Sequence, residues 1–214
     1  MTHNRGLLIV LSGFSGAGKG TIMKHLLAEY PGQYHLSVSA TTRKPRDGEV
    51  DGREYFFKTQ EQFDQMVSEG AFLEHASFNG RSYGTPKAYV EKLLSEGKDV
   101  ILEIEVQGAL QVKKILPETL LLFVTPPSAE SLKERLVGRG TEDAETIAQR
   151  LAISSRESHL MSQYDYLIIN DQLDECVHRV HEIIASEHFK TARNQEEIKD
   201  MQNQLLVFAK GEKL

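Results

Sequence analysis

Short apolar runs alternate along this chain with longer stretches in which apolar residues recur every three or four positions. The runs are typical of strands buried on both faces, and the longer stretches are typical of amphipathic helices. The runs occupy residues 7–11, 99–104, 120–124 and 166–171. Helical spacing follows over residues 21–30, 106–115, 128–137 and 173–189. Because strands and helices alternate, the sequence predicts a layered α/β fold built on a parallel sheet.

The pattern changes over residues 50–85, where the expected elements become short. They are a strand at Tyr55–Phe57, a helix near residues 60–68 and a strand at Phe72–Phe78. Asn79-Gly80 then follows as a hairpin signal. This stretch is predicted to be a small unit inserted into the α/β fold, and a helix from about Pro86 to Ser95 returns the chain to the fold.

The last stretch, residues 190–214, is charged and rich in amides. Its apolar residues follow a 3, 4, 3 spacing at Ile198, Met201, Leu205 and Phe208. Two heptads are too few to establish a coiled coil. We expect the tail either to dock on the body or to help form a dimer, and the sequence leaves the oligomeric state open.

A glycine-rich loop joins the first predicted strand to the first predicted helix. Its residues are Gly13, Phe14, Ser15, Gly16, Ala17, Gly18, Lys19, Gly20 and Thr21. The glycines let backbone N–H groups turn inward, and the helix N-terminus adds partial positive charge, so the loop can wrap a polyphosphate. Lys19 supplies a full charge. The hydroxyl expected directly after the lysine comes one residue late, as Thr21, and is still available to a metal ion.

A basic cluster follows residues 34–39, whose short alternating pattern predicts a strand. Arg43, Lys44 and Arg46 place three cations within four residues, ahead of the turn at Asp47-Gly48. Two interpretations stay open on spacing alone. The cluster is either a solvated basic loop or a second phosphate site that faces the first.

Two acids end the apolar run at residues 99–104. Glu103 and Glu105 are two residues apart, so on a strand they would project to the same side, and the carboxyl end of that strand should lie beside the phosphate loop. Such carboxylates can hold Mg²⁺ directly or through water. The alternative, a solvated strand end, is weaker because Glu103 lies inside the apolar run.

Arginines and glycines gather near residues 135–150. Arg135 and Arg139 flank a glycine, and Arg150 follows on the next predicted helix. This composition is typical of a mobile lid with arginine contacts. Ion pairs with helical neighbours are the alternative, and the available acids are Glu134, Glu142 and Glu145.

Composition narrows the setting. The 214 residues are 40% hydrophobic and 26% charged, as in a globular domain, and the net charge of −6 does not indicate general affinity for nucleic acid or anionic membranes. The first apolar run is too short for a signal peptide or a membrane span, so we expect a cytoplasmic protein. Cys176 is the only cysteine, which suits a reducing compartment. His178 and His181 are expected on a solvated helix face rather than in a metal site, because no further spaced ligands accompany them.

In this order the features resemble guanylate kinases of bacterial type over residues 5 to about 187. The most specific run is Val38–Arg43 with Pro45-Arg46 and Gly48-Glu49. The resemblance implies transfer of the γ-phosphoryl group of ATP to GMP, and to dGMP, with Mg²⁺. It divides the chain into a core (5–38, 86–134 and 151–187), a GMP-binding unit (39–85), a lid (135–150) and a C-terminal helical tail (188–214).

The resemblance also assigns roles to single residues. The GMP phosphate would be bound by Arg43, Arg46, Tyr55 and Tyr83. Guanine would be read by Ser39, Glu74 and Thr85, with Glu103 as a further substrate contact. Lys19 would hold the ATP phosphates, and the bridge between donor and acceptor would be made by Arg135, Arg139 and Arg150.

The chain departs from the family pattern at few positions. Phe14 replaces the usual proline, Thr85 replaces the common serine, and Glu103 and Glu105 replace aspartates, yet no functional group is lost. One rival interpretation is a non-catalytic guanylate-kinase-like interaction module, against which the intact loop and lid arginines argue. A second rival is a kinase for another monophosphate, because Gly-Lys-Gly-Thr loops also occur in adenylate kinases. Glu74 and the inserted unit argue against it.

Overall fold

A five-stranded parallel sheet lies at the centre of the protein. The computed structural model describes residues 5–78, 80–138, 140 and 143–209. The strands, in their order across the sheet, are β2 (Tyr34–Leu36), β7 (Asp99–Glu103), β1 (Leu8–Gly13), β8 (Leu120–Thr125) and β9 (Tyr166–Ile169). Every pairing among them is parallel. The α/β class predicted from the apolar runs is therefore confirmed.

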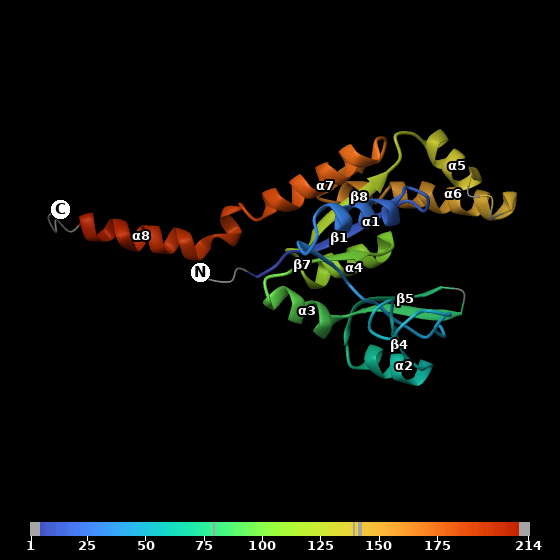
Figure 1. Ribbon diagram of the computed structural model, residues 1–214, viewed down its shortest axis with the longest axis horizontal. Helices are drawn as coiled ribbons and strands as arrows, with labels where there is room; N and C mark the ends of the chain where they lie inside the picture. Colours follow the sequence, from blue (N-terminus) through green and yellow to red (C-terminus); the bar gives the residue numbers. More distant parts are fainter. Residues whose placement is uncertain (1–4, 79, 139, 141–142, 210–214) are drawn as a thin grey trace.

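Helices cover both faces of this sheet and complete three layers (Figure 1). One face is covered by α1 (Lys19–Glu29), α5 (Ala129–Gly138) and α7 (Leu173–Glu187), with α6 (Ala144–Ser158) beside α5. The other face is covered by α3 (Lys87–Ser95) and α4 (Val106–Ile115). Successive residues of β1 supply the two cores in turn, since Ile9 belongs to the first and Val10 to the second. Both are fully buried, and each such side chain stabilises the fold by about 1.5–3 kcal/mol.

A smaller four-stranded sheet forms the inserted unit. Its strands, in order, are β4 (Phe56–Phe57), β3 (Ala40–Thr41), β6 (Arg81–Pro86) and β5 (Phe72–Phe78), and α2 (Gln60–Ser68) covers it. Phe63 of α2 stacks on Phe72 of β5 with ring centroids 4.6 Å apart. Thr59 caps α2 in a reciprocal capping box with Gln62, which fixes where this helix begins. Asn79, part of the predicted hairpin turn, lies outside the described residues.

The chain passes from one sheet to the other where the sequence predicted a single strand over residues 34–39. β2 ends at Leu36, and β3 begins at Ala40 in the smaller sheet. A second expectation was also wrong, because Glu105 does not lie on β7. β7 ends at Glu103, and Glu105 is the residue before α4, whose first residue, Val106, is fully buried. Because Val106 already packs into the core as the first residue of α4, Glu105 is the N-cap of that helix and not a strand residue. The two acids therefore do not share a strand face.

The histidines of α7 correct another expectation. His181 is not on a solvated face, because its ring stacks on Tyr30 at 3.7 Å and its Nδ1 lies 2.6 Å from the Tyr34 hydroxyl. Cys176, on the same helix, is buried, and burial raises the pKa of its thiol to about 11. Cys176 is therefore a packed core residue.

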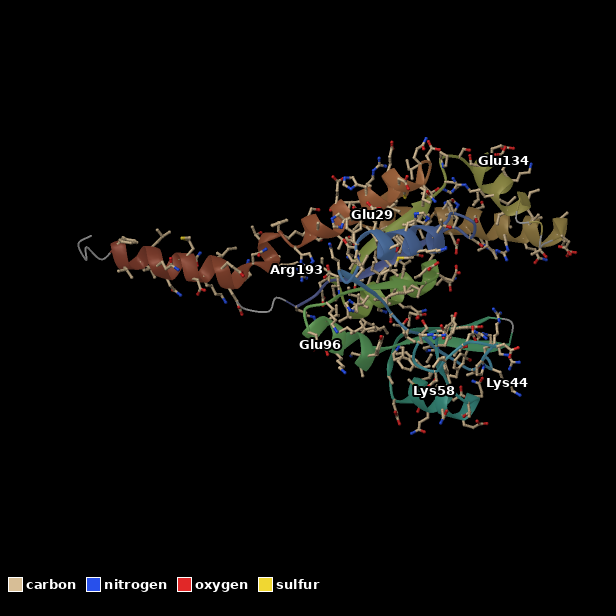
Figure 2. All side chains as sticks on the ribbon, in the orientation of Figure 1. Glu29, Lys44, Lys58, Glu96, Glu134 and Arg193 are labelled. Atoms are coloured by element: carbon tan, nitrogen blue, oxygen red, sulfur yellow. The ribbon has the colours of Figure 1, made fainter. Side chains whose placement is uncertain are left out.

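The C-terminal helix α8 (Gln195–Ala209) extends away from the body rather than docking on it (Figure 1). Arg193, in the turn before α8, donates to the backbone carbonyl of Arg5, so the tail starts beside the N-terminal end of the chain (Figure 2). Met201, Leu205 and Phe208 are exposed on the helix. Among the described residues, no helix combines the length and the apolar character needed to cross a membrane.

Candidate active site

The glycine-rich loop lies at the carboxyl edge of the parallel sheet, directly after its central strand. Gly13 pairs with Val124 of β8, and Leu11 pairs with Glu103 of β7, so the loop and Glu103 meet at one edge. Strands that follow β1 in the chain lie on both sides of it in the sheet. Open α/β sheets bind ligands outside the carboxyl ends of the strands at such a switch point.

Close contacts explain why the loop needs glycine. A Cβ at Gly13 would lie 2.0 Å from the carbonyl oxygen of Val124, and a Cβ at Gly18 would lie 2.5 Å from Nδ2 of Asn170. Gly18 also has φ 96°, in the left-handed region. Because Gly18 is the N-cap of α1 and has no side chain to offer, the first N–H groups of the helix are left for a ligand. The arrangement favours an anion.

Lys19 lies across the loop to which it belongs. Its Nζ donates to the carbonyl oxygens of Gly13 at 2.7 Å and Phe14 at 3.2 Å. The Phe14 side chain, in the place of the expected proline, is buried and packs edge-on against Phe123 with centroids 5.0 Å apart. Aromatic packing thus anchors the loop at Phe14. Thr21, in the first turn of α1, is exposed.

Of the three arginines that the sequence analysis assigned to a lid, two contact the loop. Arg135 of α5 donates to the carbonyl oxygens of Ala17 at 3.3 Å and Asn170 at 2.7 Å. Arg150 of α6 donates to the Ser15 hydroxyl at 2.8 Å. Arg139 lies outside the described residues. Glu134, one of the acids considered for helical pairing, is exposed on α5 (Figure 2).

Asn170 is a site residue that the sequence reasoning missed. It follows β9 directly and is buried, and its Nδ2 donates to the Ala17 carbonyl at 2.8 Å. A cavity of about 320 Å³ opens beside it, lined by Gly16, Gly18, Thr21, Arg135, Asn170, Asp171 and Leu173. The signal was available, since polar residues that follow a buried parallel strand lie at the same edge as the loop.

A second cavity, also about 320 Å³, lies between the two sheets. It is lined by Leu36, Ser37, Ser39, Glu54, Tyr55, Thr85, Leu102, Glu103 and Ile104. Ser39, Tyr55, Thr85 and Glu103 were singled out from the sequence, so the structure brings these four together. Glu54 was not singled out, and Arg43, Arg46, Glu74 and Tyr83 do not line the cavity.

Glu74 stands behind Thr85 at this second cavity. The Thr85 hydroxyl donates to Oε1 of Glu74 at 2.7 Å, and Glu74 is 8% exposed. Burial raises the pKa of the Glu74 carboxyl, and the Thr85 hydrogen bond opposes the shift. A carboxylate held this way can accept hydrogen bonds from a neutral ligand that presents neighbouring donors.

Arg43 is held by Glu49, a second residue that the sequence reasoning gave no role. Its two terminal nitrogens donate to the Glu49 carboxylate at 3.0 and 2.9 Å. This hydrogen bonding, with the Arg46 backbone N–H at 2.8 Å, holds the pKa of Glu49 below its ordinary value. The Arg43 guanidinium also lies 5.2 Å from the Tyr55 ring centroid, and Tyr55 is 6.1 Å from Tyr83.

The other two cations of the basic cluster face solvent. Lys44 and Arg46 are both exposed, and Lys44 lies at the outer edge of the inserted unit (Figure 2). The solvated interpretation therefore holds for Lys44. The clustering of Arg43 with two tyrosine rings supports the phosphate-site interpretation for that residue, because a guanidinium and hydroxyls together can bind a phosphoryl group.

Acids surround the ammonium group of Lys19. Glu103 is accessible from the cleft, yet desolvation by neighbouring atoms raises the pKa of its carboxyl, while the charge of Lys19 lowers it and that of Glu105 raises it. Glu157 of α6 behaves similarly, because burial and Glu105 raise its pKa to about 7 against the opposing charge of Lys19. Glu157 was not singled out from the sequence, where nothing distinguishes it from other helical acids.

The donors around the loop suit a hard cation. A Cβ at Gly20 would lie 3.6 Å from Oε1 of Glu103, so this carboxylate faces the start of α1, where Thr21 follows. Within the described part of the chain, no three His, Cys, Asp or Glu residues cluster closely enough to hold a metal ion by themselves. Oxygen donors beside a polyphosphate site match Mg²⁺, which usually takes few protein ligands and keeps water and phosphate oxygens.

A parallel sheet with a phosphate loop after its central strand, arginines from two helices on that loop and a small inserted sheet together define a P-loop nucleoside monophosphate kinase fold. Comparisons with known proteins refine this class. A family model described as guanylate kinase matches residues 5–187. The chain belongs to the guanylate kinase family.

Individual relatives agree with this family. A protein named guanylate kinase from Bacillus anthracis is 51% identical over 201 residues, which cover 94% of this chain and 98% of the relative. Another from Lactococcus lactis subsp. lactis is 51% identical over 191 residues, 89% of this chain and 93% of the relative. A crystal structure of guanylate kinase from Anaplasma phagocytophilum matches with a TM-score of 0.69 at 31% identity, covering 89% of this chain and 90% of that chain.

Proposed function

We propose that this protein, an ATP:GMP phosphotransferase by its family, uses the phosphate loop for ATP and the cavity between the sheets for GMP. The observation that carries the proposal is the buried Glu74 carboxylate, which is held directly behind that cavity by Thr85, one of its lining residues. Guanine presents two neighbouring donors, N1–H and the 2-amino group, and one carboxylate can accept both. Adenine presents neither of them.

On the donor side, the chain's own groups bind and align the ATP phosphates. The loop N–H groups and the start of α1 would hold phosphate oxygens, and Lys19 would exchange its bonds to Gly13 and Phe14 for bonds to phosphate. Arg135 and Arg150 already lie against the loop, so a small movement would bring them to the transferring group. We assign Arg139 to the same task.

On the acceptor side, Arg43, Arg46, Tyr55 and Tyr83 would bind the GMP phosphate. Arg43 would then leave or share its carboxylate partner Glu49, which holds the guanidinium ready in this structure. Ser39 and Thr85 would complete guanine recognition beside Glu74. Phosphoryl transfer asks the protein mainly for alignment and charge neutralisation, and these groups supply both.

Mg²⁺ would lie between the loop and the acidic strand end. We propose Thr21 as a ligand, with Glu103 and Glu105 acting directly or through water. Held there, Mg²⁺ would supply positive charge that offsets the negative charge developing on the phosphates during transfer. Glu103 has a second role open to it, because it also lines the cavity proposed for GMP.

The proposal extends to setting and substrates. We propose that the protein works in the cytoplasm, where ATP and GMP are available, and that dGMP is a second acceptor. None of the base-reading or phosphate-binding groups named here addresses the ribose 2′-hydroxyl, so its loss should be tolerated.

A coupled assay of ADP release tests the proposed function. GMP, dGMP, AMP, CMP and UMP are offered in parallel at equal concentration with ATP and Mg²⁺. We expect turnover with GMP and dGMP and little with the other three. Equal use of AMP and GMP would contradict the proposed base recognition, and turnover with none of them would contradict the phosphotransferase.

A further inference from the structure

A glycine inside α4 lies against the carboxylate proposed to read guanine. Gly108 is buried in the first half of this helix, and a Cβ built on it would lie 3.1 Å from Oε2 and 3.4 Å from Cγ of Glu74. The same Cβ would lie 3.4 Å from Cδ1 of Ile104, which lines the cavity between the sheets. A side chain at residue 108 would therefore press on the cavity from behind.

Glycine is a poor choice for a helix interior unless something requires it. It lowers helix stability relative to alanine, and α4 gains nothing from a turn here, since the helix runs unbroken over Val106–Ile115. φ at Gly108 is not among the positive values of the chain. Glycine is required at residue 108 because Glu74 and Ile104 occupy the space that a side chain would fill.

The Glu74 carboxylate has little freedom to move away. Oε1 is fixed by the Thr85 hydroxyl at 2.7 Å, and the residue is 8% exposed. Oε2, the oxygen that Thr85 does not hold, is the atom nearest to the position that a Cβ of residue 108 would take. Added bulk at residue 108 would thus act on the oxygen that is still available to a ligand.

The contact joins two parts of the fold. Glu74 belongs to β5 of the inserted unit, and Gly108 belongs to α4, which packs on the parallel sheet on one side and on β5 on the other (Figure 1). Because Ala109 and Val112 anchor α4 in the core that it shares with the parallel sheet, the helix offers a fixed surface against which Glu74 can rest.

We propose that Gly108 is a positioning residue for guanine recognition: the missing side chain leaves the space in which α4 seats the Glu74 carboxylate against Thr85. The proposal rests on the assignment of Glu74 as guanine reader. A methyl group at residue 108 would displace the carboxylate by a few tenths of an ångström, because contacts of 3.1 Å to a carbon are too close. It would leave the ATP loop untouched.

The test compares Gly108→Ala with Gln111→Ala, an exposed position one turn along the same helix. For Gly108→Ala we expect KM for GMP to rise about tenfold with kcat changed less than about threefold, since small misplacements of binding groups have effects of this order. The affinity for ATP should not fall, because the phosphate loop makes no part of this contact. Gln111→Ala should match the wild type in all of these. Unchanged KM for GMP in Gly108→Ala overturns the proposal.

A second pair of variants separates this inference from the proposed function. In a Glu74→Ala background no carboxylate remains to be displaced, so adding Gly108→Ala should lower kcat/KM for GMP no further. An additional loss there means that Gly108 acts by another route and overturns the proposal. If Glu74→Ala itself keeps full selectivity for GMP over AMP, it is the assignment of Glu74 that fails.

Folding itself is informative in the same set. If Gly108→Ala fails to fold but the double variant folds, the clash with Glu74 is established and the proposal stands. If both fail to fold, residue 108 is needed for α4 packing independently of Glu74, and the proposal is overturned.

Discussion

Glu74→Gln offers a sharp test of how the base is chosen. The amide has nearly the shape of the carboxylate, and the Thr85 hydroxyl, 2.7 Å from Oε1, can still donate to the amide oxygen. With the hydroxyl donating, the amide oxygen takes the place of Oε1 and the NH₂ group takes the place of Oε2. A donor then faces the donors of guanine.

The size of the effect follows from the contacts that are lost. Two hydrogen bonds from guanine to a charged acceptor contribute about 1.5–3 kcal/mol each, so their loss corresponds to roughly 10²–10⁴ in kcat/KM for GMP. AMP never makes these bonds, and binding AMP leaves a buried, poorly paired carboxylate that the amide replaces. AMP activity should therefore fall far less, and the GMP to AMP ratio should narrow.

The assay measures kcat/KM for GMP and AMP in wild type, Glu74→Gln and Glu69→Gln, an exposed glutamate of the same unit that serves as control. ATP affinity, measured alone, should be the same in all three. If Glu74→Gln keeps both its GMP activity and its discrimination against AMP, guanine is read elsewhere, most directly by Ser39 and Thr85, and the reasoning is refuted.

Three further predictions concern the loop, the lid and Glu157. Lys19→Ala should reduce turnover by at least about 100-fold, since one preorganised charge lowers the barrier by on the order of 3 kcal/mol. Its thermal midpoint should stay close to that of the control Lys24→Ala, and near-normal turnover would exclude the phosphate role. Arg135→Lys keeps the charge but loses the planar guanidinium that donates to the Ala17 and Asn170 carbonyls, so kcat should fall. GMP affinity, measured by calorimetry without ATP, should stay unchanged. A collapse of GMP affinity would instead assign Arg135 to the acceptor site. Glu157, with its pKa raised from 4.5 to about 7, contributes stability that is present below pH 4.5 and lost as the pH rises to 7. Denaturant unfolding should therefore show Glu157→Gln gaining stability relative to wild type across that window, and a pH-independent difference between the two would contradict the raised pKa.

Much of the parallel sheet could be predicted because its strands are continuous apolar runs. Residues 120–124 are all buried, and a run of that kind between polar segments has few other places to go. α4 was predicted with its observed bounds, since its buried positions recur with helical spacing. The phosphate loop could also be predicted from the sequence, because its glycines and Lys19 follow a strand and begin a helix.

The small sheet was harder to predict, for a physical reason. β5 and α2 were predicted with their observed bounds, and β4 to within one residue. β3, in contrast, has only two residues, and β6 contains Arg81, Gly84 and Pro86, so neither carries an alternating pattern of its own. These strands exist because they pair with distant partners, as Ala40 does with Gly84 and Phe56. Local sequence holds no record of such pairings.

The site shows the same limit. Residues in the recognisable runs were found, whereas Asn170 and Glu157 were given no role because their partners lie on other elements. Glu49 was given none because only the folded loop turns it back onto Arg43, six residues earlier. Asn170 and its partner Ala17 are 153 residues apart in the chain, and only the folded sheet brings them within 2.8 Å. Glu105 was misplaced on β7 because spacing alone cannot show where a strand ends and the next helix begins.

The central claim is that the γ-phosphoryl group of ATP passes to GMP and not to water. Incubation of γ-labelled ATP with the protein, Mg²⁺ and GMP, followed by separation of nucleotides from inorganic phosphate, tests it directly. We predict that the label appears in GDP, and that without GMP nearly all of it stays in ATP. Label that accumulates in inorganic phosphate at the same rate with and without GMP would contradict the account.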